Sequence, residues 1–135
     1  MTDATLRNAG ILLILLPTVA FGGVSILRLM FSDYMKNPIR RRLWTAGHAH
    51  AGVLLVLSLV AFQYVDAADL SEGMTSLVRT LIPSAAIFIP AAFFLSVLAP
   101  DAEKPNALIN LAYVGFVALS AGLLILGFGL ISAAG

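Results

Sequence analysis

His48 and His50, the only histidines in the chain, lie within the six-residue run Gly47 to Gly52. Imidazole nitrogens bind haem iron and transition-metal ions, and they also form hydrogen bonds between helices. A spacing of two residues on an α-helix separates the two side chains by about 200°. Pairs that chelate one ion from a helix are spaced four residues apart instead. We therefore expect His48 and His50 to face different neighbours and not to share one ion.

Three interpretations of these histidines follow from residue chemistry. One of them can be an axial ligand of haem, with the other in a supporting hydrogen bond or a second site. Either can bind a transition-metal ion or a proton, with further ligands from other helices or another subunit. Both can instead make structural hydrogen bonds between helices. The chain has no cysteine, which excludes thiolate ligands and iron–sulfur clusters. Candidate second ligands are Met30, Met35 and Met74.

The segments that carry these residues are apolar enough to cross a membrane. Of the 135 residues, 60% are hydrophobic and only 11% are charged, whereas about a quarter of a soluble domain is charged. Four segments reach the length of about 20 residues that a bilayer requires: 8–31, 43–65, 76–99 and 106–132. Short joints between them predict an all-α protein, a single domain over 1–135 that forms an up-down bundle of four transmembrane helices. The lipid bilayer is its expected surrounding, and no basic tract points to nucleic acid.

The charges of the joints predict an orientation. Lys36 and the three arginines at 40–42 lie in the first joint, whereas the second carries Asp66, Asp69 and Glu72. The positive-inside rule places the Lys36–Arg42 joint in the cytoplasm and both termini outside. We expect the membrane to be a bacterial plasma membrane.

Glycines in the last segment predict how it packs. Gly115, Gly122 and Gly129 are spaced seven residues apart, which keeps them near one helix face. Small residues let helices approach closely in lipid. We expect a helix–helix seam on this face, either inside one subunit or between subunits.

The stretch Arg-Arg-Arg-Leu-Trp-Thr-Ala-Gly-His-Ala-His-Ala-Gly-Val-Leu-Leu, beginning at Arg40, resembles a helix start in the haem–copper oxidase superfamily. The resemblance implies that His48 is an axial ligand of a haem b and that Arg41 or Arg42 binds its propionates. It also implies that this end of the helix faces away from the cytoplasm, against the charge rule. The large subunit of that family has many more helices and a copper site with three histidines. This chain has neither, so we expect no oxygen or nitric oxide reduction and no independent catalytic activity.

The sequence thus predicts a small membrane protein that binds haem or a transition-metal ion through His48 and His50, with Arg41, Arg42 and Trp44 beside them. Its expected role is electron transfer, cofactor handling or sensing, as a homo-oligomer or as a subunit of a larger membrane complex. The alternatives are a non-catalytic accessory subunit, with structural histidines, and a small oligomeric pore or transporter.

Overall fold

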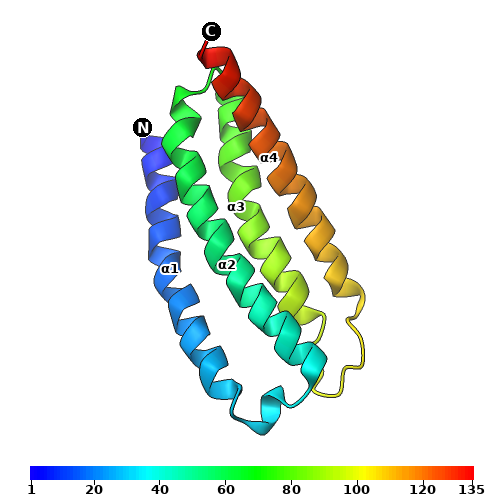
Figure 1. Ribbon diagram of the computed structural model, residues 1–135. Helices are drawn as coiled ribbons and strands as arrows, with labels where there is room; N and C mark the ends of the chain where they lie inside the picture. The colour runs from blue at the N-terminus through cyan, green and yellow to red at the C-terminus, as the bar shows by residue number, and fades with distance from the viewer.

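Four long helices make up the structure, a computed structural model that describes residues 1–135. They are α1 (Asp3–Leu29), α2 (Pro38–Tyr64), α3 (Glu72–Leu95) and α4 (Leu111–Ala133). Short 3-10 turns, η1 (Asp33–Met35), η2 (Val65–Ala67) and η3 (Ala107–Asn110), lie between them. Successive helices run in opposite directions, so both termini lie at the same end (Figure 1). The predicted all-α, up-down arrangement of four helices is confirmed.

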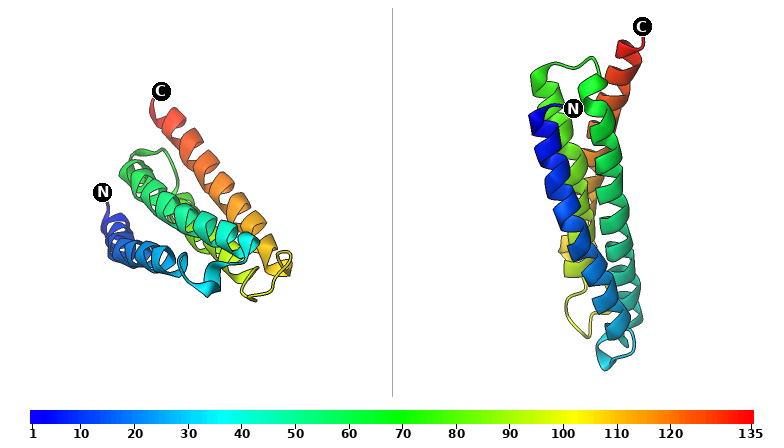
Figure 2. Two further views of the ribbon diagram at one scale, coloured as in Figure 1. Left: turned by 60° about the horizontal axis from the view of Figure 1, so that its bottom comes forward. Right: turned by 90° about the vertical axis from the view of Figure 1, so that its left-hand side faces the viewer.

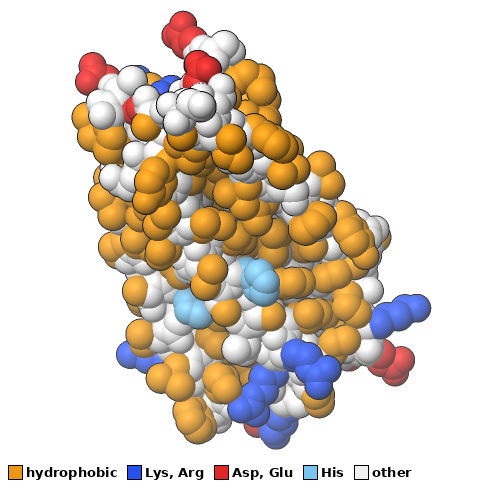
Figure 3. Space-filling view, turned by 45° about the horizontal axis from the view of Figure 1, so that its top comes forward, with side chains coloured by type: hydrophobic (Ala, Val, Ile, Leu, Met, Phe, Trp, Pro, Cys, Tyr) orange, Lys and Arg blue, Asp and Glu red, His pale blue; other side chains and the backbone are white.

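All four helices are long and apolar enough to cross a membrane. Large apolar side chains are exposed along each of them, which suits contact with lipid. The space-filling view shows this apolar band, with acidic side chains gathered at one end and most basic side chains at the other (Figure 3). Both histidines lie in the band and not among the charged residues at its ends.

The helices differ in how far they are buried. α2 and α3 lie side by side in the middle, α1 packs mainly against α2, and α4 packs mainly against α3 (Figures 1 and 2). In the most apolar stretch of α1 only 6% of the residues are buried, against 28% to 33% in the other three helices. α1 is therefore a peripheral helix on a three-helix core.

Polar caps start three helices earlier than hydropathy predicts. α2 begins at Pro38 and not at residue 43, because the Asn37 side chain accepts hydrogen bonds from the backbone nitrogens of Ile39 (3.0 Å) and Arg40 (3.3 Å). Proline suits the first helical position, where no backbone donor is needed. Similar caps by Thr2 and Ser71 start α1 and α3.

The earlier start of α2 moves the residues of interest deeper into the helix. The arginines at 40–42 fall in its first turns, and not in a joint. His48 lies about 15 Å and His50 about 18 Å along the axis from Pro38, at 1.5 Å per residue.

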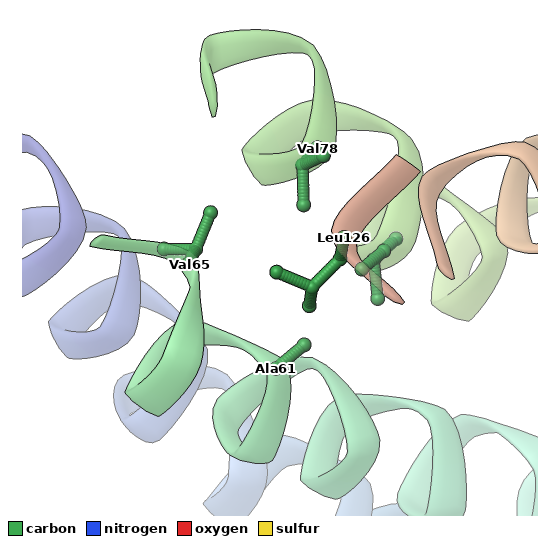
Figure 4. Packing of buried hydrophobic residues seen from close by; sticks show 5 residues of the cluster. Ala61, Val65, Val78 and Leu126 are labelled. Carbon is green, nitrogen blue, oxygen red and sulfur yellow. The ribbon is translucent and has the colours of Figure 1, made fainter. Parts of the chain in front are cut away.

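Small and branched apolar side chains fill the core. Near the end that holds the termini, Ala61 of α2, Val65 of η2, Val78 of α3 and Leu126 of α4 converge (Figure 4). Val65 and Val78 are fully buried, so α2, α3 and α4 form a continuous packed unit.

The glycine stripe of α4 is a seam inside the subunit. A methyl group added at Gly115 or Gly122 would lie 2.6 Å from a side-chain carbon of α3, and one added at Gly129 would lie 2.7 Å from Leu70. The predicted seam is thus confirmed, and it joins α4 to α3 and to the joint that precedes α3.

This seam predicts the effect of one added methyl group. Gly122→Ala places a carbon 2.6 Å from Ile82 Cγ1 and 3.3 Å from the Ile82 backbone nitrogen, so α3 and α4 must separate. We expect a loss of about 1 to 3 kcal/mol in the free energy of unfolding, as for other overpacked sites. Thermal melting in detergent, followed by circular dichroism, measures it. Gly127→Ala is the matched control, because nothing lies within 4 Å of that position; equal melting temperatures for the two variants would contradict the seam.

Candidate functional site

His50 is exposed on α2, and one of its ring nitrogens is already engaged. Its Nδ1 lies 2.8 Å from the carbonyl oxygen of Ala46, one turn earlier. A carbonyl can only accept, so Nδ1 carries the proton and donates it. The ring also packs edge-on against Phe93 of α3, with centroids 5.2 Å apart. In the neutral ring, this hydrogen bond fixes the tautomer in which Nε2 carries the lone pair that could bind a metal.

His48 is half-buried and faces α1. A methyl group added at Gly23 would lie 2.7 Å from its Nε2, and one added at Gly22 would lie 3.8 Å from its Nδ1. The glycine pair therefore lets the imidazole rest against the α1 backbone. His48 also borders a cavity of about 320 Å³ between α1, α2 and α3, whose walls include Ser25 and Trp44.

The two histidines therefore diverge, as their spacing predicts. His48 packs against α1 and His50 packs against Phe93 of α3. Figure 3 shows both rings on one surface of the molecule, separated from each other within the apolar band.

No group of three or more His, Cys, Asp or Glu side chains converges anywhere in the chain. One subunit alone thus offers no set of three such side chains to one ion. Met74 lies in the first turn of α3, beside the end of α2, and is about 20 Å along the axis from the histidines. Met35 is buried in η1. Met30 is the C-cap residue of α1, about 10 Å along that helix from Gly23, which meets His48 and not His50.

The arginines beside the histidines have unlike surroundings. Arg41 and Arg42 are exposed and form no ion pair. Arg42 lies about 12 Å along the axis from His50 and about 80° around the helix, whereas Arg41 lies on the side opposite His50, at about 180°. Of the two, Arg42 is the better placed beside His50.

Arg40, which sequence reasoning did not select, is completely buried. Its guanidinium carbon lies 3.8 Å from the ring centroid of Tyr34 and 4.8 Å from that of Trp44. Trp44 in turn packs edge-on against Tyr34 and against Phe94 of α3, at 5.7 Å in each case. The three guanidinium nitrogens and Trp44 Nε1 are buried without a hydrogen-bond partner. The spacing of four residues between Arg40 and Trp44 is the one sequence signal that could have suggested their contact.

A second polar cluster, which the sequence also did not predict, lies at the end of the molecule that holds both termini. Arg79 of α3 forms an ion pair with Asp66 of η2 at 2.6 Å and donates to Thr5 Oγ1 of α1 at 2.8 Å. Asp66 also accepts from the backbone nitrogen of Thr2 at 2.6 Å and from Thr5 Oγ1 at 2.9 Å. We call these four residues the clasp, because they tie the start of α1 to α2 and α3.

The sequence matches no protein-family model, and no curated protein or solved structure is significantly similar to it. The fold and the residues described above thus define its class by themselves. The chain is a four-helix protein of membrane type, with an exposed histidine on its apolar surface and a buried arginine without a hydrogen-bond partner near its basic end.

The clasp predicts how α1 is held. Asp66→Asn leaves the Arg79 guanidinium, only 11% exposed, without its counter-charge. Removing one partner of a buried ion pair costs about 3 kcal/mol or more. We expect a lower melting temperature and faster hydrogen exchange in the first turns of α1.

A matched control is available in the exposed ion pair of Asp33 and Lys36. These side chains are 91% and 75% exposed, so Asp33→Asn should change stability little. Equal effects of the two substitutions on hydrogen exchange in α1 would show that the clasp does not hold this helix.

Proposed function

We propose that this chain is an integral membrane protein that binds haem through His50, as part of a homo-oligomer, and that it serves electron transfer or haem handling. The observation that carries the proposal is the state of His50. Its Nδ1 is held by the Ala46 carbonyl, and its Nε2 is free on an exposed, apolar surface. Ionisable side chains in the membrane are costly and mark functional sites.

The number of side chains that could act as ligands fits haem better than a bare metal ion. Structural zinc takes four ligands and catalytic zinc takes three from the protein, whereas no three such side chains converge here. Haem iron needs only one or two side chains. When bound, haem would supply one-electron redox chemistry at its iron.

Between the two histidines, the geometry favours His50 as the ligand. The resemblance to the haem–copper oxidase superfamily carries the axial role to His48. The ring of His48, however, rests against α1 at Gly22 and Gly23 and is half-buried, whereas His50 is exposed. The role of His50 is to present Nε2 in a fixed tautomer, and Arg42 is the cation best placed to meet a propionate near it.

A second protein ligand for the haem would come from a second copy of the chain. The only other histidine, His48, packs against α1 on a different face of α2, and Met74 lies about 20 Å away along the axis. A two-fold axis beside α2 would bring two His50 side chains together, as isologous interfaces do. This is the reason for the homo-oligomer in the proposal.

Optical spectroscopy of the purified protein tests the proposal. Protein from haem-sufficient cells, or reconstituted with haem, should show a Soret band at no more than one haem per chain. His50→Ala should abolish the band, because the alanine lacks Nε2. His48→Ala is the matched control and should retain it.

Three results would overturn this function. The first is no Soret band after reconstitution, and the second is a band that survives His50→Ala but is lost in His48→Ala. The third is stoichiometric zinc, copper or nickel without haem in elemental analysis, which would assign the site to an ion shared between subunits.

The orientation in the membrane is part of the proposal. The end with the α1–α2 and α3–α4 joints carries six basic residues against three acidic ones, and the other end carries two against four. This difference favours a cytoplasmic α1–α2 joint, with both termini outside.

The absence of cysteine makes the orientation simple to measure. We expect Ser32→Cys to react with a membrane-impermeant maleimide only after the membrane is opened. Gly73→Cys, at an exposed position with open space around it, should react in intact cells. The reverse pattern would mean that the arginines bind other groups and do not set the orientation.

A further inference from the structure

We propose that the groove lined by Trp44 and His48, next to the buried Arg40, binds an anionic phospholipid, with its phosphate near Arg40 and Trp44 and one acyl chain in the His48 cavity. This inference is independent of haem binding, because it uses a different face of α2. It starts from the buried guanidinium, which has no acceptor.

The aromatic rings around Arg40 compensate only part of the cost of burying its charge. Cation–π contacts with the two rings stabilise the cation, but they are weaker than the penalty for burying an unpaired ion. The rings also accept none of the five N–H donors in the usual way. An acceptor-rich anion is therefore the group that this site lacks.

No carboxylate of the chain fills that role. Three lie at the same end of the molecule: Asp33, Asp101 and Glu103. Asp33 pairs with Lys36 at 2.7 Å, and neither of the others pairs with a basic residue. The anion would thus come from outside the chain.

Trp44 connects the buried arginine to the cavity. Its ring contacts Arg40, and it lines the cavity together with Phe94 and His48. Its Nε1 is a further unpartnered donor. A phosphate offers several acceptors, and arginine can bind two of them at once.

The dimensions of the cavity fit one acyl chain. Its α1 wall extends from Thr18 to Leu29, about 16 Å along the helix. One leaflet contributes about half of the 30 Å hydrocarbon thickness, or about 15 Å. Six of the ten residues that line the cavity are hydrophobic, and exposed basic residues lie at the same end of the molecule as Leu29, including Arg28 and Arg41. Charge and length thus both favour an anionic lipid that enters from that leaflet.

Trp44 is the only tryptophan, so its fluorescence reports on this site alone. Protein in neutral detergent is titrated with dioleoylphosphatidylglycerol, dioleoylphosphatidylcholine or inorganic phosphate. We expect a saturable spectral shift with the anionic lipid, at least tenfold tighter than with the zwitterionic lipid. Inorganic phosphate should give no shift at millimolar concentration.

Two pairs of variants test the two parts of the site. Arg40→Gln should weaken anionic lipid binding about tenfold, whereas Lys36→Gln, which removes one exposed charge from the same joint, should change it less than threefold. Gly22→Leu fills the cavity and should also weaken binding. Gly10→Leu, at an open position of the same helix, should not.

Each contrary result overturns the proposal. Equal affinity for the two lipids would remove the role of Arg40. A shift with inorganic phosphate would assign the site to a free anion. Unchanged binding in Gly22→Leu, with an altered oligomer mass, would assign the groove to a helix of a second copy. If Arg40→Gln does not fold, the proposal is still tested by the comparison of the two lipids on the unchanged protein and by the comparison of Gly22→Leu with Gly10→Leu.

Discussion

Close approach between helices is the constraint on which this structure depends. In lipid, the hydrophobic effect does not drive apolar helices together, because lipid chains are as apolar as the side chains. The helices are therefore held by close packing contacts that only small residues allow. Gly115 and Gly122 bring α4 against α3, and Gly47 brings α2 against Phe93 and Phe94. Most backbone hydrogen bonds are made inside the helices, 88 of 105, so the backbone needs little else. α2, α3 and α4 thereby form one packed unit.

α1 is held against the bundle differently from the other three helices. It has few buried residues: Ala9 and Leu12 pack against Leu55 and Phe62 of α2. It is also held by the clasp at its start, by the glycine pair against His48, and by the joint that leads to α2. Between these places cavities remain along α1, one beside the clasp and one beside His48. A peripheral helix with one small apolar cluster and a few polar contacts leaves space that a fully packed bundle would close.

The first half of α2 carries both candidate sites on different faces. His50 presents a free nitrogen outward beside Phe93, whereas Arg40 and Trp44 turn toward η1 and the cavity. The proposed haem would thus lie at an interface between copies and the proposed lipid in a groove of one copy. Neither occupant would exclude the other, and the rigid contact between α2 and α3 would hold both faces in place.

The sequence by itself determined the four spans, their alternating direction, the glycine seam and the divergence of the two histidines. These features depend on hydropathy and helical periodicity, which are local properties of the chain. It did not determine which arginine is buried, because Arg40, Arg41 and Arg42 are chemically alike and only the position of Tyr34 in η1 encloses the first of them. Nor did it predict the clasp, since Thr2, Asp66 and Arg79 are far apart in the chain and meet only through helix packing. The preference for His50 over His48 likewise comes from tertiary contacts: α1 covers one ring, and α3 leaves the other open.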